Sequence, residues 1–236
     1  MKLGIIGAMD IEVAALKENM RELTVHSRTG MTFYEGRLCG LDAVVVQCGV
    51  GKVNAAMCTQ ILCDLFAVTH VVNTGVAGSL NAKLDIGDLV IGRDAMYHDF
   101  DCHVINENYC VGQVPGMAVL AYPADEMLVS CAYDAAESVN PGHTTIGRVA
   151  SGDQFVCSKD QKDAIISNTG AMCTEMEGAA IAHTAWRNGV PFVVIRAISD
   201  KADDSAEMDY PTFEAIAAKR CAAVTMALAE KLTDAK

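Results

Sequence analysis

The sequence is short of basic residues and of long apolar runs, and each shortage argues against a class of function. It holds 18 Lys and Arg against 30 Asp and Glu, for a formal net charge of −12 at pH 7. Nucleic acids and anionic membrane surfaces are bound by clustered Lys and Arg, so neither is expected as a partner. No apolar run approaches the roughly 18–20 residues that span a bilayer. The apolar stretch at the N-terminus is too short for a signal peptide, and Asp10 and Glu12 follow it at once, so we expect a cytoplasmic protein.

Cysteine motifs for metal or redox chemistry are also missing. The chain has ten cysteines but no Cys-x-x-Cys pair, which argues against a zinc ribbon or a thioredoxin-type centre. We therefore expect reduced, mostly buried thiols that pack as small hydrophobic side chains. His98, Asp99, Asp101 and His103 lie close together, yet there is no His-Glu-x-x-His motif and no Cys/His pair at zinc spacing. We expect a polar turn near the site there, and neither a metal ion nor a cofactor.

The chain does have enough apolar residues for a large core. Hydrophobic residues make up 51% of it and charged residues only 20%, which excludes global disorder. Strand-like and helix-like segments alternate without repeats or a Pro/Ser-rich linker, which predicts a single α/β domain over residues 1–236 with a central, largely parallel (mixed) sheet. Strands are predicted at 3–8, 32–38, 43–48, 70–73, 88–91, 145–150 and 192–198. Helices are predicted from about 10 and at 53–66, 126–138, 159–168, 179–188 and 210–231, with 98–118 irregular.

Three local predictions come from capping and turn residues. Asp10 is the predicted N-cap of the first helix, because its side chain can accept from the free N–H groups there. Residues 74–78 hold two glycines and are predicted to form a turn. Pro211 is predicted to lie in the first turn of the last helix, where its missing N–H does no harm.

The run Gly49-x-Gly51-Lys52 suggests a phosphate loop but does not satisfy the motif. A Walker loop needs Gly where Val46 stands and Ser or Thr where Val53 stands. The run is therefore either a tight turn that brings backbone close to a ligand or a purely structural turn.

Acidic side chains stand where apolar segments end, which indicates a ligand site. Phe192–Ile195 is a predicted buried strand that leads into Ser199 and Asp200, and Glu177 follows another apolar segment. Ligands of open α/β sheets bind beyond the carboxyl ends of the strands, so these side chains should converge on one pocket for a polar small molecule. Glu12 and Glu177 each open a helix, where the macrodipole favours negative charge by about 0.3–1 kcal/mol, so a structural role stays open for both.

Six fragments together resemble a known family. In chain order they are Gly4–Glu12, Asn73–Gly78, Tyr97–Asp99, Ser151–Phe155, Glu175–Glu177 and Arg196–Asp200. Each is weak alone, but the ordered set closely resembles the 5′-methylthioadenosine/S-adenosylhomocysteine nucleosidases of the purine nucleoside phosphorylase superfamily, from residue 1 to the terminal helix. The resemblance implies a three-layer α/β/α, nucleoside phosphorylase-like fold. It also implies hydrolysis of the N-glycosidic bond of 5′-thioadenosines with release of adenine, and 5′-deoxyadenosine is a further expected substrate.

The same resemblance implies a pair of catalytic carboxyls. Asp200 would protonate purine N7, Glu12 would activate the attacking water, and Arg196 would help to hold that water. Because adenine leaves more easily as a neutral base, Asp200 must carry a proton near neutral pH, which needs a low-dielectric site that raises its pKa. Glu12 must stay ionised, and its helix N-terminus favours the anion. We therefore expect the two carboxyls to be pushed in opposite directions.

The resemblance also implies how the rest of the substrate is held. Glu177 would bind the ribose hydroxyls and Phe155 would stack on adenine. The remaining implied pocket residues are Met9, Val50 and Tyr210 around the 5′-alkylthio group, and Val76, Ala77, Gly78, Val156, Glu175, Met176 and Ser199 elsewhere. In that family, part of the loop matching residues 102–115 completes the site of a neighbouring subunit, so a homodimer is implied.

One residue departs from the family pattern, and three alternatives remain. Many relatives have Ser where this chain has Val76, which removes a hydroxyl near the attacking water. The first alternative is a phosphorylase on the same fold, but a carboxylate at Glu12 would repel phosphate and Arg196 is the only obvious cation to offset it. The second is a hydrolase of futalosine-type nucleosides. The third is a non-catalytic nucleoside-binding protein, which should have lost at least one of the ionisable groups.

Overall fold

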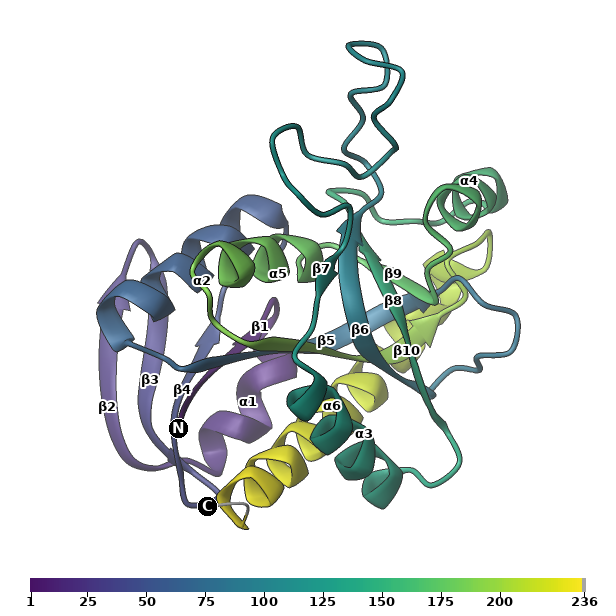
Figure 1. The fold of residues 1–236 in the computed structure, drawn as a ribbon. Coiled ribbons are helices and arrows are strands. Elements are labelled where there is room, and N and C mark those ends of the chain that lie inside the picture. The colour runs from purple at the N-terminus through teal and green to yellow at the C-terminus, as the bar shows by residue number, and fades with distance from the viewer. Residues whose placement is uncertain (235–236) are drawn as a thin grey trace.

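The computed structural model describes residues 1–234, which form one mixed sheet with helices on both faces (Figure 1). The strands are β1 Lys2–Gly7, β2 Arg21–Arg28, β3 Met31–Leu38, β4 Leu41–Gln47, β5 His70–Ser79, β6 Leu89–Tyr97, β7 Tyr122–Pro123, β8 Thr144–Ser151, β9 Cys173–Glu175 and β10 Phe192–Asp200. The helices are α1 Asp10–Glu18, α2 Lys52–Phe66, α3 Glu126–Val139, α4 Lys159–Thr169, α5 Gly178–Arg187 and α6 Ala206–Asp234.

The sheet is partly closed on itself. Its strand order is β10-β6-β8-β9-β5-β1-β4-β3-β2, with β7 beside β6, and β10 pairs with β5 as well as with β6. Five strands therefore close into a ring, and β1, β4, β3 and β2 extend from it. The pairings of β1 with β4 and β5, and of β5 with β10, are all parallel, so these strands end at the same edge.

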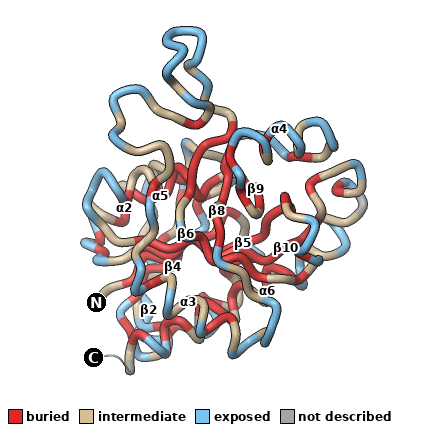
Figure 2. The backbone as a smooth tube through the Cα atoms, turned by 45° about the vertical axis from the view of Figure 1, so that its right-hand side comes forward, coloured by how far each residue is buried: buried red, intermediate tan, exposed pale blue. Residues whose placement is uncertain are grey.

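Two apolar clusters pack on the two faces of the sheet and define three layers. On β1, Ile6 packs in the cluster beneath α2 and α5, whereas Leu3 and Ile5 pack in the cluster beneath α1, α3 and α6. Side chains on opposite faces of a strand alternate, which is why one strand supplies both clusters. Figure 2 shows the sheet strands as the mainly buried centre of the molecule. The predicted three-layer α/β/α fold is confirmed.

The glycine turn predicted at residues 74–78 is wrong, because β5 continues through it to Ser79. The stretch is held in extended form by parallel pairing with β10 from Val71 to Gly78. The glycines at 75 and 78 are required for a steric reason instead. A Cβ on Gly75 would lie 2.3 Å from Glu12 Oε1, and a Cβ on Gly78 would lie 2.7 Å from Asp200 Oδ1. Glycine is required here because two carboxyl groups rest directly on the strand.

Other local predictions need correction. The N-cap of α1 is Met9, and Asp10 is the first helical residue. Helix α6 begins at Ala206, which places Pro211 inside it, beyond the first turn. Strands β2, β7 and β9 were not predicted: β2 is an exposed edge strand without apolar alternation, and the other two are only two and three residues long.

The cysteines are less buried than expected. All ten are free, as predicted, but only Cys48, Cys58, Cys173 and Cys221 are buried, whereas Cys110 is exposed and the rest are half-buried. Within residues 1–234, none of the helices combines the length and apolar character needed to cross a membrane.

The predicted irregular stretch forms an arm that projects from the body (Figure 1). Residues 98–121 connect β6 to β7 without a helix or a strand. Val104 and Ile105 on this arm are 88% and 80% exposed. We call residues 98–121 the arm from here on.

Candidate active site

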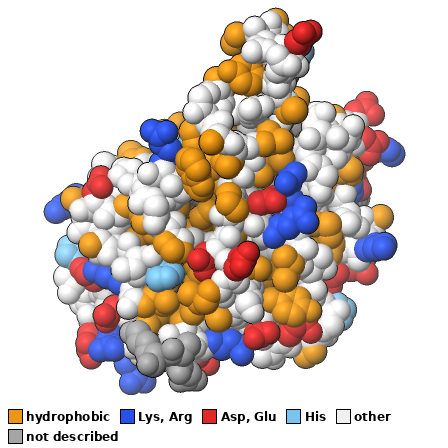
Figure 3. Space-filling view, viewed as in Figure 1, with side chains coloured by type: hydrophobic (Ala, Val, Ile, Leu, Met, Phe, Trp, Pro, Cys, Tyr) orange, Lys and Arg blue, Asp and Glu red, His pale blue; other side chains and the backbone are white. Residues whose placement is uncertain are grey.

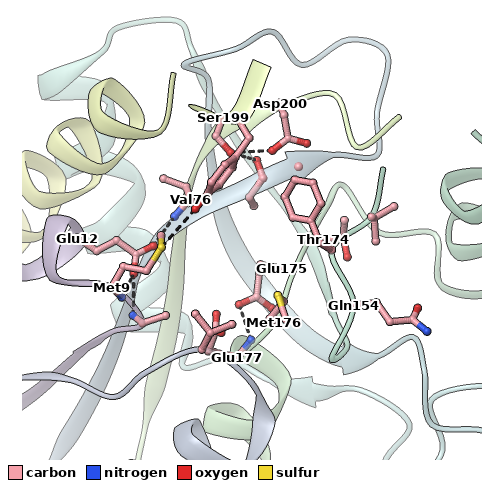
Figure 4. A pocket seen from close by; sticks show the side chains of 17 residues that line it. Met9, Glu12, Val76, Gln154, Thr174, Glu175, Met176, Glu177, Ser199 and Asp200 are labelled. Carbon is pink, nitrogen blue, oxygen red and sulfur yellow. Dashed lines mark hydrogen bonds between the residues drawn. The ribbon is translucent and has the colours of Figure 1, made fainter. Parts of the chain in front are cut away.

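A cavity of about 260 Å³ opens at the carboxyl ends of β1, β5 and β10 (Figure 4). Every site residue predicted from the sequence lines it, with the exception of Arg196. The lining residues are Ala8, Met9, Glu12, Val50, Val76, Ala77, Gly78, Gln154, Phe155, Val156, Thr174, Glu175, Met176, Glu177, Ser199, Asp200 and Tyr210. Segments far apart in the sequence therefore meet at one place, as expected for strands that end at a common edge.

Glu12 is fixed by backbone donors on one side of the cavity. Its Oε2 accepts from the N–H groups of Ala8 at 2.7 Å and Met9 at 2.9 Å, and its Oε1 accepts from the N–H of Val76 at 3.0 Å. The side chain reaches back because α1 begins only two residues earlier and leaves those N–H groups free. Three donors hold the carboxylate in one orientation.

The pKa of Glu12 is raised, which corrects our expectation that the helix N-terminus keeps it low. Glu12 is 3% exposed, and burial raises its pKa by more than Arg196 and the three backbone donors lower it. A charged group in a low-dielectric site loses more hydration than one helix terminus restores. The pKa values of Glu12 and Asp200 are therefore not pushed in opposite directions, contrary to our expectation.

Asp200 ends β10 on another side of the cavity, with fewer partners (Figure 4). Its Oδ1 accepts from the N–H of Ala202 at 2.8 Å, and the Ser199 hydroxyl donates to its Oδ2 at 2.8 Å. Burial raises the pKa of Asp200, in the direction predicted, and the neighbouring carboxylates of Asp203 and Asp209 add to the rise. Asp200 is therefore held by fewer donors than Glu12.

Arg196 lies behind the cavity wall, which differs from the expected place beside the water. It is 2% exposed, and its Nη2 donates to Glu175 Oε2 and, at 2.5 Å, to Asn73 Oδ1. Glu175 also accepts from Ser151 Oγ and from the N–H of Gly178. Burial opposes ionisation of Glu175, but Arg196 and these donors lower its pKa below the ordinary value. Arg196 and Glu175 thus form a buried ion pair under the site.

The glycine run at 49–52 forms a turn that contacts Glu177. Glu177 Oε1 accepts from the N–H of Gly51 at 2.8 Å. Gly49 and Gly51 adopt φ values of +87° and +98°, which L side chains rarely adopt. The turn therefore brings backbone to a carboxylate of the site and not to a phosphate. Burial, followed by the charge of Glu175, raises the pKa of Glu177 to about 8.

Met9, Val50 and Tyr210, which the resemblance implies around the 5′-alkylthio group, all line the cavity. The Tyr210 hydroxyl lies 3.3 Å from Met9 Sδ and donates to Glu214 Oε1 at 2.8 Å. The Phe155 ring meets the Tyr210 ring edge-on, with centroids 5.5 Å apart.

Sequence reasoning missed several residues of this site. Ala8, Gln154 and Thr174 line the cavity, and each adjoins a residue that the resemblance did point to. Asn73 and Ser151 lie one layer behind and hold Arg196 and Glu175. Both belong to fragments that carried the resemblance, but only their contacts reveal what they do.

Both acidic side chains of the polar run at 98–103 have basic partners. Asp99 binds Lys52, and Asp101 binds His103 through Nδ1 at 2.5 Å. Across the residues that the structure describes, there is no group of three or more His, Cys, Asp or Glu side chains arranged to hold a metal ion.

Comparison with known proteins places the chain in a family. The family model of the phosphorylase superfamily matches residues 2–230, so the chain belongs to that superfamily. The chain is 41% identical to a 5′-methylthioadenosine/S-adenosylhomocysteine nucleosidase of Geobacillus thermodenitrificans, over 97% of this chain and 96% of that protein. It therefore belongs to the family of 5′-methylthioadenosine/S-adenosylhomocysteine nucleosidases.

Solved structures agree with this placement. The nucleosidase of the same name from Neisseria meningitidis, in complex with methylthio-immucillin-A, has a TM-score of 0.94 and 35% sequence identity, and the match covers 98% of this chain and 99% of that one. A futalosine hydrolase of Helicobacter pylori is also similar, with a TM-score of 0.92, 31% identity and 98% of each chain covered.

Proposed function

We propose that this enzyme hydrolyses the N-glycosidic bond of 5′-methylthioadenosine and S-adenosylhomocysteine, and also that of 5′-deoxyadenosine. The observation that carries the proposal is the placement of two buried carboxyls, Glu12 and Asp200, on different sides of one cavity whose lining contains no Lys, Arg or His among the described residues. Glycoside hydrolysis uses such a pair around a sugar with oxocarbenium character. The names of the relatives support the choice of substrate.

Asp200 is the proposed general acid. Protonated Asp200 transfers its proton to purine N7 as the bond between C1′ and N9 breaks, and the base leaves with the bonding electron pair as neutral adenine. The raised pKa of Asp200 supports this role, because it favours the protonated form of the carboxyl. Its Oδ2 has only the Ser199 hydroxyl beside it, whereas Oδ1 is taken by a backbone N–H.

Glu12 is the proposed base. A water oxygen bonds to C1′ of the ribosyl cation while one water proton passes to Glu12, which gives the free 5-thioribose product. Three N–H donors orient Glu12 and favour its ionised form, while burial raises its pKa, which makes the carboxylate a stronger base than one in water. Arg196 acts from behind: its charge favours ionised Glu12 without a direct contact with the water.

Glu177 is the proposed partner of the ribose hydroxyls, and Phe155 that of the adenine ring. Both line the cavity. The apolar surroundings of Met9, Val50 and Tyr210 suit the 5′-methylthio group of 5′-methylthioadenosine, whose sulfur is only a weak hydrogen-bond acceptor.

Phosphate is a poor nucleophile for this cavity. Four carboxyl groups line it, and a phosphate placed within ~4 Å of Glu12 would be repelled by roughly 4 kcal/mol per unit charge at an effective dielectric near 20. The one buried guanidinium nearby already pairs with Glu175. Water, being neutral, meets no such repulsion.

A futalosine-type nucleoside is the second candidate substrate. The observation that favours it is the similarity to the Helicobacter pylori futalosine hydrolase, whose chain is covered as fully as those of the nucleosidases. The two substrate classes differ at the 5′ end, where this chain has the apolar residues Met9 and Val50 beside Tyr210.

We further propose a homodimer in which part of residues 102–115 completes the neighbour's site. The exposed Val104 and Ile105 on the arm support it, since a projecting segment with apolar side chains is stabilised by a partner. Figure 3 shows hydrophobic side chains gathered on the arm and on the surface below it. Light scattering coupled to gel filtration tests this, and a monomer at working concentration contradicts it.

Adenine release tests the proposed function. The enzyme is incubated with 5′-methylthioadenosine, S-adenosylhomocysteine, 5′-deoxyadenosine or futalosine, each with and without phosphate. We expect adenine from the first three at rates independent of phosphate, and a reducing sugar as the second product. A requirement for phosphate, with formation of a sugar 1-phosphate, contradicts the proposal. If futalosine is hydrolysed faster than the other three nucleosides, a futalosine-type nucleoside is the preferred substrate instead.

A further inference from the structure

Two motifs in the sequence have no part in the chemistry proposed above, and the structure joins them. Lys52, from the glycine run, places its Nζ 2.7 Å from both carboxylate oxygens of Asp99, from the polar run that opens the arm. The two side chains are only 22% and 14% exposed. The ammonium also lies 5.5 Å from the centroid of the Tyr97 ring. This ion pair is less exposed than a typical surface pair, so solvent screens it less.

A third segment, at 152–153, is hydrogen-bonded to the same two residues. The backbone N–H of Lys52 donates to Asp153 Oδ1 at 2.8 Å, and the N–H of Asp153 donates to Asp99 Oδ2 at 2.9 Å. Lys52 Nζ lies 3.6 Å from Asp153 Oδ2. Gly152 also packs closely against the polar run, since a Cβ on it would lie 2.5 Å from His98 Nε2. Three loops, at 49–52, 98–99 and 152–153, are thus held together.

Two of these loops are connected directly to the cavity wall. The residue before Lys52 is Gly51, whose N–H holds Glu177 at 2.8 Å. The residues that follow Asp153 are Gln154, Phe155 and Val156, which all line the cavity. Neither Lys52 nor Asp99 lines it. Any movement of their pair would therefore be transmitted to the ribose side and to the base side of the site at once.

We propose that Lys52 and Asp99 are a positioning pair, which sets Glu177 against the ribose and the segment 154–156 against the purine. This proposal rests on the proposed function, because the roles of Glu177 and Phe155 belong to it. The physical reason is that catalytic groups act only within a narrow geometry, so that a shift of about 1 Å caused far from the chemistry can lower the rate by roughly 100-fold.

The test compares two ion pairs of similar burial. Lys52→Met and Asp99→Asn each break the positioning pair, and Lys52→Met combined with Asp99→Asn removes both charges. Lys52→Arg keeps the charge and serves as the conservative variant. The matched control is Lys2→Met, because Lys2 and Glu35 form a pair with a 2.6 Å contact and exposures of 26% and 34% at the opposite end of β1.

Three readouts separate positioning from mere stability: kcat and KM for 5′-methylthioadenosine, the Kd of adenine by calorimetry, and amide hydrogen exchange of residues 49–52 and 152–156. For Lys52→Met we expect kcat to fall by about tenfold or more, since contacts to the sugar hydroxyls strengthen in the transition state. Adenine should bind more weakly, both segments should exchange faster, and Lys52→Arg should recover most of kcat. The double variant should lose little more than either single one. Lys2→Met should change thermal stability alone.

The proposal is overturned if Lys52→Met retains kcat and adenine affinity within about twofold of the wild type, or if Lys2→Met produces the same losses. It is also overturned if exchange at 49–52 and 152–156 is unchanged. Should Lys52→Met fold poorly, Asp99→Asn carries the same test. Failure of the proposed function is a separate outcome: the wild type itself then releases no adenine, and hydrogen exchange alone still decides whether the pair holds the two segments.

Discussion

The two carboxyls that we assign to catalysis differ in what holds them. Glu12 accepts three backbone N–H bonds and has a buried guanidinium within electrostatic reach. Asp200 accepts one backbone N–H and one hydroxyl, and the charges that affect its pKa most are carboxylates. Both are almost fully buried, and burial raises the pKa of both.

The comparison shows that burial alone does not tell an acid from a base. What differs is the set of partners: N–H groups and a cation stabilise a carboxylate, whereas neighbouring negative charge favours the protonated form. Both pKa values are raised, so it is the partners and not the direction of the shift that distinguish the two groups. This difference in partners supports the base role proposed for Glu12 and the acid role proposed for Asp200.

The largest expected effect comes from removing the acid. Asp200→Asn keeps the shape and the Ala202 contact but cannot supply a proton, so kcat should fall by about 10²–10⁴-fold, the usual range for general acid catalysis. Adenine release under saturating substrate measures it. Ser199→Ala is the control, because it removes a neighbour of Asp200 without removing the acid, and it should lose less. Near-full turnover of Asp200→Asn contradicts the assignment.

Arg196→Met removes the buried guanidinium that distinguishes the surroundings of Glu12 from those of Asp200. It leaves Glu175 buried without its cation, and the loss of one partner of a buried pair lowers the free energy of unfolding by about 3–5 kcal/mol. Urea denaturation monitored by circular dichroism measures the loss. Lys159→Met, in an exposed pair on α4, should change the same quantity far less, because solvent screens that pair. Equal losses in the two variants would show that the Arg196 pair is no more important than a surface pair.

A third prediction concerns Glu177 and the pH dependence of stability. Its pKa is 4.5 when unperturbed and about 8 in the folded protein, so between these values the folded state holds a proton that the unfolded state has released. Its contribution to stability is complete below pH 4.5 and is lost as the pH rises through about 8. The melting temperature should therefore fall across this window, and less steeply in Glu177→Gln. Parallel curves for the two proteins would contradict the raised pKa.

The smallest effect is expected at Val76, whose N–H already holds Glu12. Val76→Ser adds a hydroxyl near the proposed water, and one further hydrogen bond of about 0.5–1.5 kcal/mol corresponds to roughly a two- to tenfold rise in kcat. Val76→Ala opens the same space without a hydroxyl and should show no rise. If Val76→Ser is no faster than Val76→Ala, the water is held adequately by Glu12 without further help.

Particular residues show where sequence reasoning succeeded and where it failed. The strand at 192–198 and its acidic end were predicted because continuous apolar character and β-branched residues indicate a buried strand. The glycines at 75 and 78 led to the wrong prediction of a turn. A glycine that makes room for a carboxyl distant in the sequence looks the same in sequence as one that bends the chain. The exposed edge strand β2 had no apolar period to reveal it.

By itself, the sequence determined most of the helices and strands, the α/β class and the identity of the acidic residues at the strand ends, because these depend on local periodicity and on residue type. The three-layer architecture was implied by the resemblance to a known family. Only the tertiary structure decided which partners those acids receive. It placed Arg196 behind the site instead of in it, raised the pKa of Glu12 against the effect of its helix, and joined Lys52 to Asp99. Burial and electrostatic pairing depend on segments distant in the chain, and no local pattern of residues encodes which of them will meet.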